Sequence, residues 1–293
     1  MTYPNNYGGL EEEFSNYEKA KVAVLLVAFE GTVTYGKGTS KAPQAIINAS
    51  KNMELYDEEL AQNFSTSGIT TLAPTKVDSN AEKTAEYLYQ DTKKVIFDNK
   101  FPVIFGGEHS ITWGAAKACK EKYPDLSVLY LDAHADLRDT YDNDKFNHAC
   151  SLKRVLDVCP NFVEVGVRSM SDEEARLIKK RKMLGNIYFA KDIMTNHDNK
   201  WMDQAVSKLT KNVYISIDID CLDVSIMPAT GTPEPGGLGW YQVLELMRKV
   251  CNKKNVVGFD IVELAPIPGY HAPNFLVAKL AYKIIGYTFF GKK

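Results

Sequence analysis

The sequence predicts a three-layer α/β fold in which helices cover both faces of a mainly parallel sheet. Short apolar runs alternate along the chain with stretches of helical spacing. The runs are nearly continuous in apolar residues, which is typical of strands buried on both faces, and parallel strands need helical crossovers between them. No stretch resembles a linker, so we expect residues 1–293 to form a single domain.

The individual elements follow from local pattern. Short apolar runs rich in β-branched and aromatic residues predict strands, and apolar residues three or four apart predict helices. One helix begins with Ser171 and Glu174 at the spacing of a capping box. The expected strands are 21–29, 101–107, 126–136, 162–168, 186–190, 213–220 and 256–264, and the expected helices are 79–99, 110–123, 171–183 and 241–253.

The composition excludes several classes of protein. Charged residues make up 25% and hydrophobic residues 45%, as in an ordinary globular enzyme. A formal net charge of -2 offers no basic field for nucleic acid. No apolar run approaches a membrane span, and the amino terminus lacks the pattern of a secretory signal. We therefore expect a cytoplasmic protein with neither nucleic-acid nor membrane partners.

The cysteines point to a reducing compartment. There are 5, at scattered spacings and without a C-x-x-C pair, which argues against a disulfide framework or a structural zinc site. Cys221 lies among acids, but its apolar strand predicts a small core residue rather than a catalytic thiol.

Polar side chains end several of the expected strands. The ligand crevice of an open parallel sheet lies outside the carboxyl ends of its strands, so these groups are expected to meet there. Within 126–136, the alternation of an extended segment is expected to bring the polar residues to one face. The groups are Glu108 with His109; Asp132, His134 and Asp136; Asp218, Asp220 and Asp223; and Asp260 with Glu263.

So many convergent carboxylates require positive charge between them. Mixed Asp and His ligation suits divalent ions such as Mn²⁺, and two ions roughly 3.5 Å apart can share a water and generate hydroxide near neutral pH. Asp223 is instead expected to hold a neighbouring loop or to orient a ligand. The six candidate ligands are His109, Asp132, His134, Asp136, Asp218 and Asp220.

Four ordered motifs resemble the signatures of the ureohydrolase family, which comprises arginases, agmatinases and their relatives. They are GGEHS (106–110), DAHAD (132–136), SIDIDCLD (216–223) with TGTPEPGG (230–237), and GFDIVELAP (258–266). The segment from Gly31 also resembles the family's amino-terminal glycine and proline loop. Val224 departs from the usual proline, a change expected to alter only the loop.

The resemblance implies an eight-stranded parallel sheet, two Mn²⁺ ions per subunit, hydrolysis of a guanidinium compound to urea and an amine, and a homo-oligomer, either trimer or hexamer. It places His109, Asp132, Asp136 and Asp218 on one ion and Asp132, His134, Asp218 and Asp220 on the other, with Asp132 and Asp218 bridging.

The resemblance also implies catalytic roles. Asp136 accepts a hydrogen bond from the attacking hydroxide, and Glu263 binds the substrate guanidinium. His148 contacts the substrate and transfers a proton to the departing amine, a step that Asp136 could also perform. Without the resemblance, His148 would be read as a surface loop histidine.

The loop after Asp136 bears on the substrate. It reads LRDTYDNDKFNHACS (137–151) and lacks the Ser-Gly-Asn element with which arginases bind the carboxylate of arginine. It resembles the agmatinase branch, which implies that agmatine is cleaved to putrescine and urea. Guanidinobutyrate or another guanidino acid stays open because Arg138 could meet a distal carboxylate, whereas arginine would leave its carboxylate unpaired.

Three other classes of protein remain alternatives. A binuclear phosphoesterase would bring Arg, Lys or several His toward a phosphate, whereas these motifs end mostly in acids. A single-zinc deacetylase is disfavoured because His109 and Asp136 complete a second metal position. A catalytically silent regulatory subunit would be expected to lose ligands, and all six candidates are present.

Overall fold

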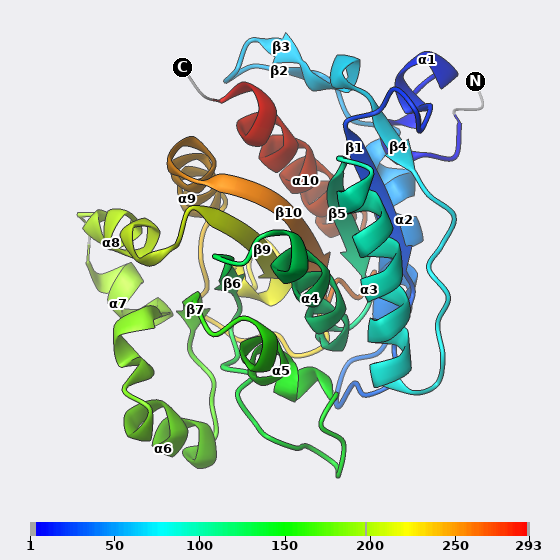
Figure 1. The fold of residues 1–293 in the computed structure, drawn as a ribbon. Coiled ribbons are helices and arrows are strands. Elements are labelled where there is room, and N and C mark those ends of the chain that lie inside the picture. Colours follow the sequence, from blue (N-terminus) through cyan, green and yellow to red (C-terminus); the bar gives the residue numbers. More distant parts are fainter. Residues whose placement is uncertain (1–3, 197, 292–293) are drawn as a thin grey trace.

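A parallel sheet forms the centre of the computed structural model, which describes residues 4–196 and 198–291 (Figure 1). Its 8 strands follow the order β4-β1-β5-β10-β9-β6-β7-β8, so the last strand of the chain lies near the middle. The strands are β1 (Val22–Val27), β4 (Ile69–Thr71), β5 (Phe101–Gly106), β6 (Ser127–Leu131), β7 (Phe162–Val167), β8 (Ile187–Phe189), β9 (Asn212–Asp218) and β10 (Asn255–Val262). A separate antiparallel pair joins β2 (Tyr56–Asp57) to β3 (Gln62–Asn63).

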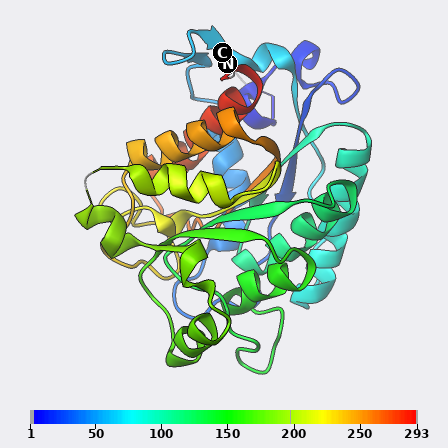
Figure 2. The same cartoon turned by 60° about the vertical axis from the view of Figure 1, so that its left-hand side comes forward.

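Helices cover both faces of the sheet, which gives three layers (Figure 2). The helices that pack on one face are α2 (Ala42–Ser50), α7 (Ala190–Thr195), α8 (Lys200–Lys208), α9 (Trp240–Lys253) and α10 (Ala272–Phe290). The helices on the other face are α3 (Ala81–Phe97), α4 (Thr112–Lys122), α5 (Ser151–Val158) and α6 (Asp172–Lys180). Short turns of helix complete the set: α1 (Glu12–Ser15), η1 (Tyr7–Gly9), η2 (Thr39–Lys41), η3 (Phe64–Ser67), η4 (His109–Ile111), η5 (His148–Cys150), η6 (Met183–Asn186) and η7 (Ile219–Cys221).

Strand β1 shows why the apolar runs are continuous. All of its side chains are buried, and successive ones enter opposite halves of the core. Val22 and Val24 pack with the α2 and α10 layer, whereas Ala23 and Leu25 pack with the α3 and α4 layer. Since both faces are covered, β1 carries apolar side chains at both alternating positions. The predicted α/β class and parallel sheet are confirmed.

Some elements were not predicted, for physical reasons. Strand β4 has only 3 residues at the sheet edge, too few to show a period. Helix α10 is buried around most of its circumference and therefore lacks the polar stripe that marks an amphipathic helix. None of the helices in residues 4–196 and 198–291 is both long and apolar enough to cross a membrane.

Candidate metal centre and active site

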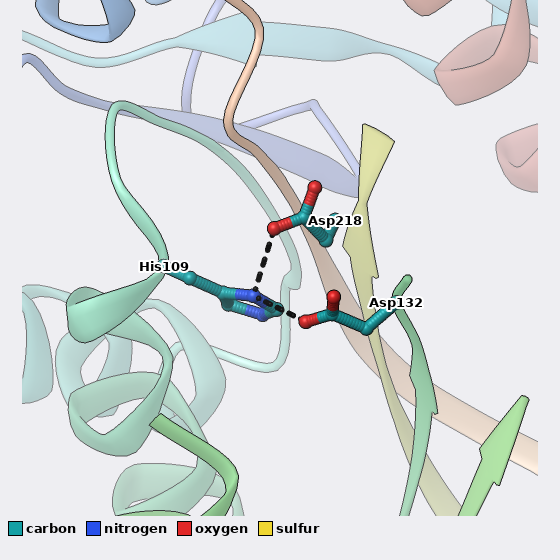
Figure 3. A group of neighbouring side chains, drawn as sticks. All are labelled: His109, Asp132 and Asp218. Atoms are coloured by element: carbon teal, nitrogen blue, oxygen red, sulfur yellow. Dashed lines mark ion pairs between the residues drawn. The ribbon is translucent and has the colours of Figure 1, made fainter. Parts of the chain in front are cut away.

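Three of the predicted ligands meet at the carboxyl ends of strands in the middle of the sheet. His109 follows β5, Asp132 follows β6 and Asp218 ends β9. The Nδ1 atom of His109 lies 3.2 Å from Oδ2 of Asp132 and 3.2 Å from Oδ2 of Asp218 (Figure 3). All three side chains are buried, and their ligand atoms are close enough together to share one metal ion.

A second group adjoins the first through Asp132. Nδ1 of His134 lies 3.0 Å from Oδ2 of Asp220 and 3.6 Å from Oδ1 of Asp132. These three residues also bring ligand atoms within range of one ion, so Asp132 belongs to both groups. Asp136 lies at the edge of the first group, with Oδ2 3.6 Å from Nδ1 of His109.

The convergence of Asp132, His134 and Asp136 does not come from strand alternation, so that part of the prediction was wrong. Strand β6 ends at Leu131, and the three polar residues lie in the loop beyond it. The backbone of Asp136 adopts a left-handed conformation, with φ of 48°, and its carbonyl accepts a hydrogen bond from the Lys153 N–H. The chain therefore turns back on itself, which returns Asp136 to His109 while His134 faces Asp220.

The acids and histidines perturb one another strongly. Burial disfavours the charged form of His109, but hydrogen bonding and attraction to Asp132 and Asp218 raise the pKa of its imidazole well above the usual value. Burial raises the pKa of Asp136, and repulsion from Asp132 raises it further. Burial likewise raises the pKa of Asp218, with repulsion from Asp220 and Asp132 adding to the effect. Without a cation, this centre is therefore electrostatically unfavourable.

The hydrogen bonding of Nε2 of His109 shows whether Nδ1 of the same ring can bind a cation. Nε2 of His109 lies 2.8 Å from Oγ of Ser216, and that hydroxyl donates to Oδ1 of Asp260 at 2.7 Å. Because the only hydroxyl proton of Ser216 goes to Asp260, Nε2 of His109 must carry the proton. The lone pair of Nδ1 in the neutral ring then faces the carboxylates of Asp132 and Asp218, an arrangement that a bound cation stabilises.

Two carboxylate oxygens support the same conclusion. Oδ2 of Asp132 and Oδ2 of Asp220 are buried, and apart from the histidine nitrogens beside them no described residue offers either oxygen a hydrogen bond. Oxygen atoms from aspartates and imidazole nitrogens, with no cysteine among them, form a donor set suited to divalent ions such as Mn²⁺. The residues therefore fit two metal ions.

Two further predicted acids lie outside the two His and Asp groups. Asp260 is fully buried within β10, and Ser216 connects it to His109. Asp223 accepts hydrogen bonds from the backbone N–H groups of Gly236 and Gly237, each at 3.0 Å. Its predicted role of holding a neighbouring loop is confirmed.

A cavity of about 230 Å³ opens beside the two groups. Glu263 lines it directly after β10, with φ of 65°, and its Oε1 accepts a hydrogen bond from the His109 N–H at 2.7 Å. The Glu263 N–H donates to the carbonyl of Gly107 at 2.7 Å. Gly107 must be glycine, because a Cβ there would lie 1.9 Å from the carbonyl oxygen of Phe29. This close packing holds an acid with an unusual backbone conformation against the centre.

The cavity also contains residues from the loop after β6. His148 is half-buried rather than exposed, and Arg138 lies over the ring of Tyr141, 4.9 Å from its centroid. The lining residues are Thr34, His109, His134, Ala135, Asp136, Arg138, Tyr141, His148, Ala149, Ser169, Met170, Ser171, Glu174, Asp218, Thr232 and Glu263.

Several residues that shape the centre were missed at the sequence level. Tyr130 stacks on His109 with ring centroids 4.5 Å apart and donates to Oδ2 of Asp136 at 3.0 Å. Arg168 donates to the backbone carbonyls of Asp220 and Glu234. Tyr130 sits within an apolar run, and Arg168 contacts backbone atoms. Apart from lying in or beside a strand, neither residue has a feature in the sequence that predicts a role at the centre.

Comparison with known proteins agrees with this geometry. A family model described as "Arginase family" matches residues 20–286. The chain belongs to the arginase family. The two adjoining His and Asp groups agree with the binuclear metal site for which the arginase family is known.

Members of the arginase family resemble the chain over nearly its full length. An N(1)-aminopropylagmatine ureohydrolase of Synechocystis sp. is 36% identical over 285 residues, which cover 94% of this chain and 92% of that protein. An agmatinase of Pyrococcus horikoshii is 33% identical and covers 91% of this chain and 92% of its own length. The crystal structure of an agmatine ureohydrolase of Thermoplasma volcanium superposes with a TM-score of 0.86 at 33% identity, covering 94% of this chain and 92% of that one. The predicted family and its eight-stranded fold are confirmed.

Proposed function

We propose that the protein is a binuclear manganese ureohydrolase that cleaves agmatine to putrescine and urea. The observation that carries the proposal is the position of Asp132, shared by two His and Asp groups at the edge of a cavity that also contains Glu263. Related proteins named for the hydrolysis of agmatine or an agmatine derivative support this reaction class.

The proposed ligands are divided between two ions. His109, Asp132, Asp136 and Asp218 would hold one, and Asp132, His134, Asp218 and Asp220 the other. When bound, the ions supply a water that is deprotonated near neutral pH and can attack a poor electrophile. The chain's own contribution is to hold these side chains in place before substrate arrives, through Ser216, Tyr130 and the backbone N–H groups that donate to Asp132 and Asp218.

Glu263 would orient the substrate. A guanidinium is a planar cation, and a carboxylate fixed by its backbone can pair with it and present its carbon to the centre. Asp136 lies between the centre and the cavity and would direct the attacking oxygen through a hydrogen bond. His148 would protonate the departing amine, since a neutral amine leaves far more readily than an amide anion.

Arg138 bears on which guanidino compound is accepted. Its Nε lies 4.0 Å from Oε2 of the buried Glu174, and its guanidinium packs on Tyr141. A substrate carboxylate would have to compete with Glu174 for this cation, whereas an ammonium group would be attracted by Glu174. This arrangement supports agmatine over 4-guanidinobutyrate. N(1)-aminopropylagmatine is a second candidate, favoured by the relative at 36% identity.

The deciding experiment measures urea release from agmatine, N(1)-aminopropylagmatine, 4-guanidinobutyrate and arginine with the same Mn²⁺-loaded protein. We expect the highest kcat/KM for agmatine. A higher value for another compound would replace the substrate and keep the chemistry, whereas two bound metals without urea release would favour a catalytically silent subunit. Homo-oligomeric assembly and a cytoplasmic location stay predictions from the sequence.

A further inference from the structure

The hydroxyl of Thr32 joins His148 to a buried carboxylate. Thr32 lies in the loop after β1, and its Oγ1 donates to Oε1 of Glu108 at 2.6 Å. The same oxygen accepts a hydrogen bond from the backbone N–H of His148 at 2.9 Å and lies 3.1 Å from Nδ1 of the His148 ring. One side chain thus contacts both the backbone and the ring of the proposed proton donor.

Counting protons at Thr32 determines which nitrogen of His148 is protonated. A hydroxyl has one proton and two lone pairs. The proton is directed to Glu108, which is a carboxylate and therefore an acceptor, and one lone pair receives the His148 backbone N–H. The remaining lone pair faces Nδ1, so this contact is a hydrogen bond only when Nδ1 carries a proton.

Glu108 keeps Thr32 in this orientation. Its carboxylate is fully buried and accepts four hydrogen bonds, from the N–H groups of Gly31 and Thr32 and from the hydroxyls of Thr32 and Ser110, all at 2.6–2.7 Å. Since Glu108 precedes His109, the loop after β1 is attached directly to the end of β5 beside the metal centre. The Thr32 hydroxyl therefore cannot easily turn away from Glu108 to donate to the imidazole.

We propose that Thr32 is a positioning residue that fixes neutral His148 as its Nδ1–H tautomer, leaving the Nε2 lone pair free to take up a proton. This inference rests on the proposed ureohydrolase reaction and deepens it. Nε2 takes a proton from water, and the imidazolium gives that proton to the departing nitrogen as the carbon–nitrogen bond breaks and its electron pair passes to that nitrogen. The oxygen added to the carbon then forms the carbonyl of urea and releases its proton to water, so no net proton is consumed. Glu108 acts through Thr32 and does not touch the substrate.

The first test observes the tautomer directly. The ¹⁵N shifts of the His148 ring are measured by NMR with Mg²⁺, which is diamagnetic, in place of Mn²⁺, and His148→Asn assigns the signals. We expect Nδ1 to be protonated and Nε2 unprotonated in the wild-type protein at a pH where the ring is neutral. An Nε2–H tautomer in the wild type would overturn the proposal, whether or not agmatine is the substrate.

The second test compares two substitutions at one position. Thr32→Val keeps the shape of the side chain but removes the hydroxyl, and Thr32→Ser keeps the hydroxyl. We expect Thr32→Val to shift the ring toward Nε2–H and to lower kcat by about 10- to 100-fold, as for other groups that orient a reactive residue, with KM and metal content little changed. Thr32→Ser should restore both readouts. Thr195→Val, an exposed threonine in α7, is the control.

The outcomes distinguish a failure of the proposed ureohydrolase function from a failure of the proposed role of Thr32. Wild-type protein that releases no urea from any guanidino compound would overturn the proposed function, while the NMR measurement would still decide the tautomer. A Thr32→Val variant with the wild-type tautomer would overturn the role of Thr32 while leaving the ureohydrolase reaction standing.

Discussion

Oδ2 of Asp132 lies 3.2 Å from Nδ1 of His109, and both side chains are buried. Because the other oxygen of Asp132 faces His134, loss of this one carboxylate affects both His and Asp groups. We expect Asp132→Ala to lower bound Mn²⁺ below two per chain and to reduce kcat/KM at least about a hundredfold, more than loss of a group that only orients a ligand. Metal analysis and urea release measure both, and Asp198→Asn, an exposed acid paired with Lys200, is the control. Wild-type turnover at limiting Mn²⁺ would show that Asp132 is not a shared ligand.

Removal of metal should destabilise the fold. Cations that bind only the folded state stabilise it by about 2.7 kcal/mol per site at a free concentration of 100 times Kd. We therefore expect chelation to lower Tm measurably and added Mn²⁺ to restore it. An unchanged Tm across the titration would contradict the presence of a metal centre.

The stabilisation of the fold by bound metal should increase with pH. Burial and acidic neighbours raise the pKa of Asp136 and Asp218 in the folded protein, so their contribution to stability is present at low pH and is lost as pH rises above the usual carboxyl range. Burial disfavours the charged form of His134, but Asp132 and Asp220 raise its pKa to about 12, so its contribution is also lost as pH rises above about 6.5. We expect the Tm of metal-free protein to fall from pH 5.5 to pH 8 and the gap to Mn²⁺-loaded protein to widen. Calorimetry at both pH values measures the gap, and a narrower gap at pH 8 would contradict this electrostatic account.

Glu263 should affect the substrate more than the metals. Its carboxylate lines the cavity and accepts the His109 N–H, and it is not part of either His and Asp group. We expect Glu263→Gln to retain this hydrogen bond and bound metal but to lower kcat/KM for agmatine about a hundredfold, because a charge-assisted pair with the guanidinium becomes neutral. Loss of metal in this variant would assign Glu263 to the centre itself. Steady-state kinetics together with metal analysis separates the two results.

Arg138 should influence discrimination between substrate tails. Its guanidinium packs on Tyr141 and faces Glu174. We expect Arg138→Gln to raise kcat/KM for agmatine relative to 4-guanidinobutyrate several-fold, since removal of a cation favours a cationic tail. A strong loss of agmatine hydrolysis would instead show that Arg138 holds the cavity in shape. Lys145→Gln, an exposed residue of the same loop, is the matched control.

The sequence predicted the centre better than the path of the chain through it. His109, Asp132 and Asp218 could be identified because strand ends in a parallel sheet meet at one edge, a rule that depends only on topology. The turn that returns Asp136 could not be predicted, because its left-handed backbone depends on contacts such as the hydrogen bond from Lys153.

The supporting residues were harder to predict. Asp260 was expected to point at the site, but its position inside β10 directs it to Ser216 and Tyr214 instead. Thr32 lies far from His148 in sequence, and only the packed loops bring the two together. Helix α10 was not predicted, because burial on most sides removes the periodic polar residues on which helix prediction depends.

The place of β10 in the sheet sets when the centre can exist. During synthesis, β1, β4 and β5 emerge early and β6, β7, β8 and β9 later, but the two sets adjoin only through β10, which pairs with β5 on one side and β9 on the other. Until residues 255–262 have left the ribosome, His109 and Asp218 belong to separate halves of an unfinished sheet. A nascent chain therefore cannot capture both metal ions before β10 has been synthesised, and assembly of the centre is delayed until then.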